Sequence, residues 1–177
     1  MNSKVVKVVL IGLPGAGKTT FGKQLAKELN FLYLDSDGLI EQKYELKIPR
    51  IFSTYGEGKF REWESEVLKE ILTNDQSIVL ATGGGAPCFN DNMDLINSLG
   101  ISVYLDVPLD IISQRLYSSK IQNRPMFEGL DSGEITLKLK SLLAQREYFY
   151  NQAKIKLSGE DFSAEFLMYE LINQLKS

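Results

Sequence analysis

The chain has 177 residues and a net charge of −3, which favours one domain spanning residues 1–177 and counts against nucleic acid as a partner. One cysteine and no histidine exclude an internal disulfide and leave carboxylates, Lys and Arg to carry any catalysis. Because no segment has the length and hydropathy of a signal peptide or a bilayer span, we expect a cytoplasmic protein without a membrane partner.

A glycine-rich loop follows the first predicted strand, residues 4–11. It reads GLPGAGKT over residues 12–19 and fits the phosphate-loop pattern G-x-x-x-x-G-K-[ST]. An amphipathic helix follows, with Phe21, Leu25 and Leu29 on one face. This order brings backbone N–H groups and the helix dipole to one point, which binds an anion. We therefore expect Lys18 to reach the outer phosphates of a nucleotide and the Thr19 hydroxyl to hold Mg²⁺, rather than a turn without a ligand.

Two carboxylates end the second predicted strand, residues 31–34. Ligands of open α/β sheets bind at the carboxyl ends of the strands, so Asp35 and Asp37 should share an edge with the phosphate loop. A helix cap at Asp37 is the alternative, and both roles are compatible. We expect Asp35 to organise Mg²⁺, directly or through a water molecule. Asp37 would then orient a substrate hydroxyl and accept its proton.

A glycine triplet, residues 83–85, follows the third predicted strand, residues 77–81. Glycine permits unusual dihedral angles and a close backbone approach, so the triplet predicts a wall for a small substrate; a flexible turn is the alternative. Cys88 comes shortly afterwards, and we expect it to be packed rather than reactive because no histidine is present to activate it.

The remaining strands and helices complete an alternating α/β pattern. Residues 101–107 predict a fourth strand, and Ile155 and Leu157 alternate with charged residues as in a weak edge strand. This alternation indicates a parallel sheet with helices on both faces, in which the first four strands are buried on both sides. The predicted helix caps are Asn90 or Asp91, a capping box from Asp131 to Glu134, Ser163, and a C-terminal Gly100.

A polar segment, residues 117–133, interrupts this rhythm and contains Arg124. Long irregular loops in compact domains are commonly functional, so we expect a lid over the phosphates, with a plain surface loop as the alternative. Arginine forks bind carboxylate and phosphate in two-pronged fashion. Only five arginines are present, and their positions invite functional roles, although a surface ion pair is the commoner fate of any one: Arg50, Arg61, Arg115, Arg124 and Arg146.

In combination these motifs resemble the shikimate kinase family. The matching strings run in family order from near residue 5 to residue 150. They are the phosphate loop with Thr20, Phe21 and Gly22, then Leu34-Asp35-Ser36-Asp37, Ile51-Phe52, Gly56-Glu57, Phe60-Arg61-Glu62-Trp63-Glu64, Gly83-Gly84-Gly85-Ala86, Tyr104-Leu105, Asn123-Arg124-Pro125 and Arg146-Glu147-Tyr148-Phe149-Tyr150. The phosphate loop is shared by many proteins, whereas the combination of the later motifs is specific.

The resemblance implies a three-layer P-loop kinase fold with a five-stranded parallel sheet of order 2-3-1-4-5, helices on both faces and a lid. It implies transfer of the γ-phosphoryl group of ATP to the 3-hydroxyl of shikimate in the chorismate pathway of aromatic amino-acid synthesis. We expect the protein to be a monomer. By family motif, the following residues would bind ATP: Gly15, Ala16, Gly17, Lys18, Thr19, Thr20 and Arg124. Those binding shikimate would be Asp37, Arg61, Gly84, Gly85 and Arg146. Lys18, Asp37 and Arg124 would be catalytic, and Thr19 and Asp35 would bind Mg²⁺.

Two departures from the family pattern concern the nucleotide side. The lid motif commonly continues Arg-Pro-Leu-Leu, whereas Met126 and Phe127 follow Pro125 here, so we expect a lid that packs differently. Many relatives carry a basic residue after the last strand, where this chain reads SGED over residues 158–161.

The alternatives to a shikimate kinase are a gluconate or nucleoside monophosphate kinase of the same architecture, or a P-loop switch protein. The last should show Asn-Lys-x-Asp, which this sequence lacks.

Overall fold

Five parallel strands form one sheet in the order β2-β3-β1-β4-β5. A computed structural model describes residues 5–118 and 125–176 of the chain. The strands are β1 (Lys7–Ile11), β2 (Leu32–Asp35), β3 (Ile78–Ala81), β4 (Ile101–Asp106) and β5 (Ile155–Ser158). This order confirms the one that the family resemblance implies.

One or two α-helices separate each strand from the next along the chain. The helices are α1 (Lys18–Leu29), α2 (Ser36–Tyr44), α3 (Ile48–Thr73), α4 (Asn92–Leu99), α5 (Leu109–Ser118), α6 (Ser132–Tyr150) and α7 (Ala164–Lys176). Two short 3₁₀ helices, η1 (Ala86–Cys88) and η2 (Pro125–Phe127), complete the list. Helix α3 is interrupted at Gly56, whose φ of 78° and ψ of 170° are not helical.

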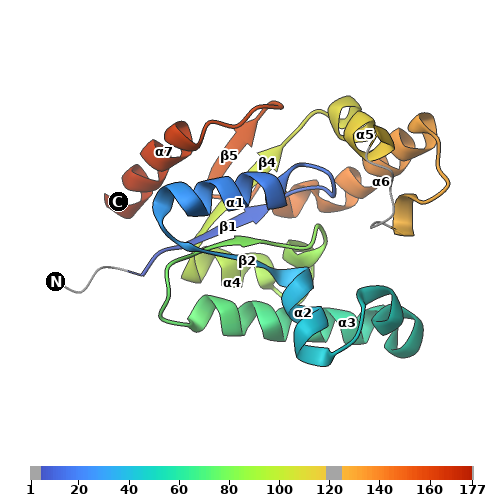
Figure 1. Cartoon of the computed structure of the whole chain (residues 1–177), viewed down its shortest axis with the longest axis horizontal. Coiled ribbons are helices and arrows are strands. Elements are labelled where there is room, and N and C mark those ends of the chain that lie inside the picture. The colour runs from blue at the N-terminus through green and yellow to red at the C-terminus, as the bar shows by residue number, and fades with distance from the viewer. Residues whose placement is uncertain (1–4, 119–124, 177) are drawn as a thin grey trace.

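The sheet lies between two layers of helices. Helix α1 crosses in front of the strands and contacts α7, whereas α4 lies behind the strands and contacts α3 (Figure 1). Right-handed crossovers require this arrangement, because the connection from β1 to β2 and the connections that follow run in opposite directions across the sheet. Among the helices of the described residues, none combines the length and the hydropathy that crossing a bilayer requires.

Burial across the sheet follows strand order and corrects one prediction. Strand β1 is buried along its whole length, and β3 is equally buried beside it. Strand β2, predicted to be buried on both faces, is half-exposed, and the Leu32 side chain is 48% accessible. The reason is its place at the edge of the sheet, which an apolar run of residues does not reveal. The weak fifth strand is the opposite edge strand, as predicted.

The helix ends confirm three of the predicted caps and overturn one. Gly100 ends α4, and its N–H donates to the Ile96 carbonyl at 2.8 Å. The capping box of Asp131 and Glu134 is present, and the Ser163 hydroxyl accepts from the Phe166 N–H at 3.2 Å. The predicted side-chain cap of α4 is wrong, since Asp91 makes no capping hydrogen bond and has a left-handed backbone. The Asn90 amide instead donates to the Arg61 carbonyl at 3.1 Å, which ties this loop to α3.

A buried lysine joins the sheet to the C-terminus of α3. Lys7 in β1 is 4% exposed, and its ammonium donates to the carbonyl oxygens of Asn74 at 2.8 Å and Gln76 at 2.5 Å, and also to Ile71. Burial lowers the pKa of Lys7, partly offset by Asp75. The last carbonyls of a helix lack intrahelical partners and carry a partial negative charge, so an ammonium satisfies them well.

Candidate active site

A cleft of about 1290 Å³ opens along the carboxyl ends of the strands. Its walls come from the loop after β1, the end of β2, the start of α2, the middle of α3 and the loop after β3. The predicted nucleotide residues among the described ones all line it: Gly15, Ala16, Gly17, Lys18, Thr19 and Thr20. The predicted acid, metal and substrate residues line it as well: Asp35, Asp37, Arg61, Gly84, Gly85 and Arg146.

The loop after β1 leaves a helix N-terminus open to the cleft. Gly15 and Gly17 have φ values of 88° and 92°, and Gly17 caps α1 without a side-chain hydrogen bond. A Cβ on Gly15 would lie 2.8 Å from the Ile112 side chain, so α5 packs directly against the loop. The first N–H groups of α1 can therefore be satisfied by an anion in the cleft.

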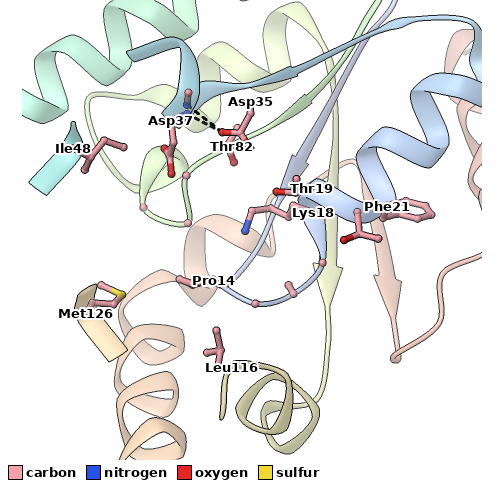
Figure 2. A pocket seen from close by; sticks show the side chains of 18 of the residues that line it. Pro14, Lys18, Thr19, Phe21, Asp35, Asp37, Ile48, Thr82, Leu116 and Met126 are labelled. Carbon is pink, nitrogen blue, oxygen red and sulfur yellow. Dashed lines mark hydrogen bonds between the residues drawn. The ribbon is translucent and has the colours of Figure 1, made fainter. Parts of the chain in front are cut away.

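The Lys18 ammonium is held by its own loop. It donates to the carbonyl oxygens of Gly12 at 2.7 Å and Leu13 at 2.9 Å. In Figure 2 Lys18 and Asp37 lie on facing sides of the cleft. Both observations place a cation at the predicted phosphate position. Arg124, the predicted phosphate-binding residue of the lid, lies outside the described residues.

Asp35 caps α2, and the Tyr33 hydroxyl links it to Thr19. Its Oδ1 accepts from the N–H groups of Asp37 at 3.1 Å and Gly38 at 3.3 Å (Figure 2). Its Oδ2 accepts from the Tyr33 hydroxyl at 3.3 Å, and that hydroxyl also interacts with the Thr19 hydroxyl. Burial is the main cause that raises the pKa of Tyr33 to about 12. The cap that the sequence offered as an alternative role for Asp37 is therefore made by Asp35.

The donor set around Asp35 suits a magnesium ion that arrives with a nucleotide. Mg²⁺ in such sites takes one or two carboxylates, substrate phosphates and several waters, not a cage made of protein. Among the described residues, no three His, Cys, Asp or Glu side chains gather to hold a metal by themselves. A hydroxyl at Thr19 and a carboxylate at Asp35, joined by Tyr33, fit the smaller set.

Asp37 reaches into the cleft from the first turn of α2. Burial raises the pKa of its carboxyl group, and the Asp35 carboxylate raises it further, whereas Lys18 and Arg61 lower it. A raised pKa makes this carboxylate a stronger proton acceptor than an ordinary aspartate. The arrangement fits a general base better than a structural cap.

The glycine triplet allows a close approach to the backbone, which is one of the two properties of glycine that the sequence analysis considered. None of Gly83, Gly84 and Gly85 is among the glycines with positive φ. A Cβ would lie 2.7 Å from Oδ1 of Asp37 at Gly83, and 2.8 Å from Nη2 of Arg61 at Gly85. Real side chains do not tolerate such distances, so glycine lets the functional side chains lie directly against the backbone.

Arg61 is held in α3 by carboxylates and aromatic rings. Its Nη1 donates to Oε2 of Glu64 at 2.8 Å, and Nη2 and Nε donate to Oε1 of Glu57 at 3.0 and 3.3 Å. Its guanidinium lies 4.1 Å from the Phe89 ring centroid. Glu64 is only 1% exposed; burial raises its pKa, while Arg61 and Arg146 lower it. The Arg61 fork is therefore rigid and faces the glycine wall.

Arg146 approaches the same wall from α6. A Cβ on Gly84 would lie 3.0 Å from its Nη1. The Cys88 thiol nearby is half-buried, and burial raises its pKa to about 11. At neutral pH this thiol is protonated, which agrees with the packed, unreactive cysteine that the sequence predicted.

The far end of the cleft is formed by segments to which the sequence assigned no contacts. The Arg115 guanidinium donates to the Glu160 carbonyl at 2.9 Å, and Glu160, Asp161 and Phe162 line the cleft beside it. Of the expected irregular segment 117–133, Ser118 still belongs to α5, residues 125–127 form η2, and α6 begins at Ser132. Phe127 is buried, and the expectation of a lid that packs differently stays a prediction.

The roles of two cleft residues and of one residue that supports the site were missed from the sequence. Glu64 follows Arg61 by one helical turn, so the spacing itself was a usable signal. Arg115 was noticed as a rare arginine without a role, and only the fold brings it to the loop after β5. Tyr33 looked like one more apolar strand residue, and nothing in its neighbours along the chain marks it as a link between Thr19 and Asp35.

Comparison with known proteins gives a consistent result. Residues 14–176 match the family model described as shikimate kinase. A shikimate kinase of Azobacteroides pseudotrichonymphae is 40% identical over 169 residues, covering 96% of each chain. The crystal structure of the Bacteroides thetaiotaomicron shikimate kinase matches with a TM-score of 0.87 and 35% identity over 97% of this chain and 99% of that one. The Acinetobacter baumannii shikimate kinase, solved in complex with shikimate, matches with a TM-score of 0.82 and 35% identity over 97% and 93%.

Proposed function

The chain belongs to the shikimate kinase family, and we propose that it transfers the γ-phosphoryl group of ATP to the 3-hydroxyl of shikimate. The products are shikimate 3-phosphate and ADP, in the pathway that leads to the aromatic amino acids. One observation carries this proposal beyond family membership: a single cleft collects an anion-binding loop, the carboxylates of Asp35 and Asp37, and the guanidiniums of Arg61 and Arg146. Those are the groups that join a triphosphate to a small hydroxylated acid.

The phosphate loop is proposed to hold the nucleotide. The backbone N–H groups at the start of α1 bind the β- and γ-phosphates, and the Lys18 ammonium exchanges its two loop carbonyls for phosphate oxygens. Arg115 and the loop through Phe162 are proposed to receive the adenine. These contacts would replace the basic residue that the loop after β5 lacks.

Asp37 is proposed as the general base. It accepts the proton of the shikimate 3-hydroxyl as the oxygen bonds to the γ-phosphorus and the bond from that phosphorus to the ADP oxygen breaks. The raised pKa of its carboxyl group supports this role, because the proton acceptor is stronger. Phosphoryl transfer depends mostly on positioning and charge stabilisation, so the rigid walls of the cleft are expected to contribute as much as the base.

Thr19 and Asp35 are the residues proposed to hold Mg²⁺, Asp35 either directly or through a water molecule. When bound, the ion neutralises charge that develops on the phosphate oxygens. The Tyr33 hydroxyl interacts with both the Thr19 hydroxyl and the Asp35 carboxylate, which keeps these two groups close to each other. Asp35 gives one oxygen to the cap of α2, so its orientation is already set.

Arg61 and Arg146 are proposed to grip the shikimate carboxylate against the glycine wall. A guanidinium has five N–H donors, and hydrogen bonds to Glu57 and Glu64 use three of those on Arg61. One N–H on each terminal nitrogen remains, which suits a two-pronged contact with a carboxylate. Gly84 and Gly85 line the shikimate ring.

We further propose that the chain is one kinase domain and acts as a monomer in the cytoplasm. The segment containing Arg124 is proposed to close over the phosphates.

A coupled assay of ADP release tests the proposed function. Purified protein receives Mg-ATP with shikimate, gluconate or AMP as the acceptor in parallel reactions. We expect turnover with shikimate only. A chelator that removes Mg²⁺ should abolish this turnover, and added Mg²⁺ should restore it. Turnover with gluconate or AMP alone would reject the acceptor, and no turnover with any of them would favour a regulatory P-loop protein.

A further inference from the structure

A buried tyrosine holds the glycine wall from behind. Tyr150, the last residue of α6, is 0% exposed, and its hydroxyl donates to the Gly84 carbonyl at 2.6 Å. Burial raises the pKa of this hydroxyl, so it remains a proton donor at any physiological pH. The role proposed above for the wall assigns nothing to this side chain.

The hydrogen bond sets the orientation of one peptide unit. The Gly84 carbonyl and the Gly85 N–H belong to the same peptide, and in a trans peptide these two groups point in opposite directions. The peptides of the described residues contain no cis bond. Tyr150 therefore directs the Gly85 N–H away from itself. Among the described residues, no hydrogen bond uses the Gly84 or Gly85 N–H as a donor.

The neighbouring backbone groups of the wall are already occupied. The Gly83 N–H donates to the buried Ser36 hydroxyl at 3.0 Å, the Ala86 N–H to the Gly83 carbonyl at 3.1 Å, and the Cys88 N–H to the Gly85 carbonyl at 2.9 Å. The Gly84 carbonyl completes this set. Two donors of the wall remain for a ligand. The Gly84 N–H belongs to the peptide whose carbonyl binds the Ala86 N–H, and the Gly85 N–H belongs to the peptide that the Tyr150 hydrogen bond orients.

The same helix also supplies Arg146, which is proposed to bind the shikimate carboxylate. Arg146 and Tyr150 are one turn apart on α6, the spacing at which side chains share a helix face. Arg146 lies against Gly84, and it interacts electrostatically with the Tyr150 hydroxyl. A shift of the wall relative to α6 would change the distance between Gly84 and this guanidinium, and the tyrosine hydrogen bond opposes that shift.

We propose that Tyr150 is a positioning residue for the acid substrate. Its hydroxyl holds the peptide between Gly84 and Gly85 so that the Gly85 N–H faces the acceptor, and it keeps that peptide in register with Arg146. Tyr150 does not touch the substrate. This inference rests on the proposed function, since it concerns the wall against which shikimate lies.

Tyr150→Phe tests the proposal because it removes one oxygen and keeps the ring, which packs 5.1 Å from the Tyr104 ring. We expect the KM for shikimate to rise about 3- to 10-fold, the effect of one neutral hydrogen bond. The values of kcat and of the KM for ATP should stay within about twofold. Tyr148→Phe is the matched control, since Tyr148 is on the same helix and 75% exposed, and it should change neither constant.

A binding measurement separates this proposal from the proposed function. Trp63 is the single tryptophan of the chain and lies on α3, so its fluorescence can follow a titration with shikimate. Weaker shikimate binding by the variant, with an unchanged Kd for ATP, supports the positioning role. An unchanged KM and Kd for shikimate overturn it. An equal fall in kcat/KM for shikimate and for ATP also overturns it, as does a variant that does not fold. A wild-type protein that neither binds nor phosphorylates shikimate rejects the proposed function instead.

Discussion

Replacing Arg61 by lysine is the most direct test of the proposed binding site for the shikimate carboxylate. The substitution keeps a positive charge next to the buried Glu64 carboxylate and removes the planar fork. A lysine ammonium has three N–H donors, whereas the guanidinium already gives three to Glu57 and Glu64 and has two left. The variant should therefore fold normally and lose its two-pronged grip on the shikimate carboxylate.

The structure also explains why alanine is the poorer choice. Glu64 is 1% exposed and forms a salt bridge with Arg61 at 2.8 Å. Removing one partner of a buried ion pair costs about 3–5 kcal/mol, which for a chain of this size lowers Tm by about 6–20 °C. Arg61→Ala would mix that loss of stability with the loss of substrate binding.

The expected loss for Arg61→Lys is that of one charge-assisted hydrogen bond, about 1.5–3 kcal/mol. At about 1.4 kcal/mol for each factor of ten, kcat/KM for shikimate should fall about 10- to 150-fold. The fall should come from KM more than from kcat, because the carboxylate is remote from the reacting hydroxyl. The KM for ATP should remain within about twofold.

Steady-state assays with each substrate varied in turn would measure these constants, and thermal unfolding would check the fold. Arg50→Lys makes the same chemical change at an exposed position of α3 and should behave as wild type. A shikimate KM within about twofold of wild type in Arg61→Lys, with Tm unchanged, would refute the two-pronged anchor.

Three further changes probe the base, the wall and the scaffold. Because the pKa of Asp37 is raised above its ordinary value of 3.8, the acid limb of a kcat/KM profile against pH should lie above that value, and a limb at or below it would contradict the base. The ionised carboxylate also costs stability at neutral pH, so Asp37→Asn should abolish turnover and raise Tm in thermal unfolding. Gly83→Ala would place Cβ 2.7 Å from Oδ1 of Asp37 and should lower kcat about 10- to 100-fold in the coupled assay; normal turnover would show that the wall yields. Lys7→Met leaves carbonyls at the end of α3 unsatisfied and should lower Tm by about 2–12 °C with normal kinetics, whereas an unchanged Tm would deny Lys7 a structural role.

Local patterns in the sequence predicted the strands, most helix ends and the phosphate loop. A phosphate loop is defined by consecutive residues, because its N–H groups and its lysine belong to one short segment, residues 12–19. The capping box of Asp131 and Glu134 is equally local and is present as predicted. Caps failed where backbone geometry intervened, as at Asp91, whose left-handed conformation makes no side-chain cap.

Relations between distant segments were decided by packing. Both Asp35 and Asp37 were recognised as functional candidates, but which of them caps α2 depends on backbone angles that the residue types do not specify. The exposure of β2 follows from its edge position, which strand order determines. The reason for glycine in the wall is tertiary, because Asp37 and Arg61, from two other elements, lie where a Cβ would be.

The sequence by itself determined that the chain folds as a P-loop kinase of this family, because the functional residues of the family lie in short contiguous sequence motifs. Only the tertiary structure decided how the groups between those motifs are held: Glu64 against Arg61, Tyr33 between Thr19 and Asp35, and Tyr150 behind Gly84. The physical reason is that side chains far apart in the chain interact only after the sheet and its helices have packed, and their partners then depend on distance and burial rather than on position in the sequence.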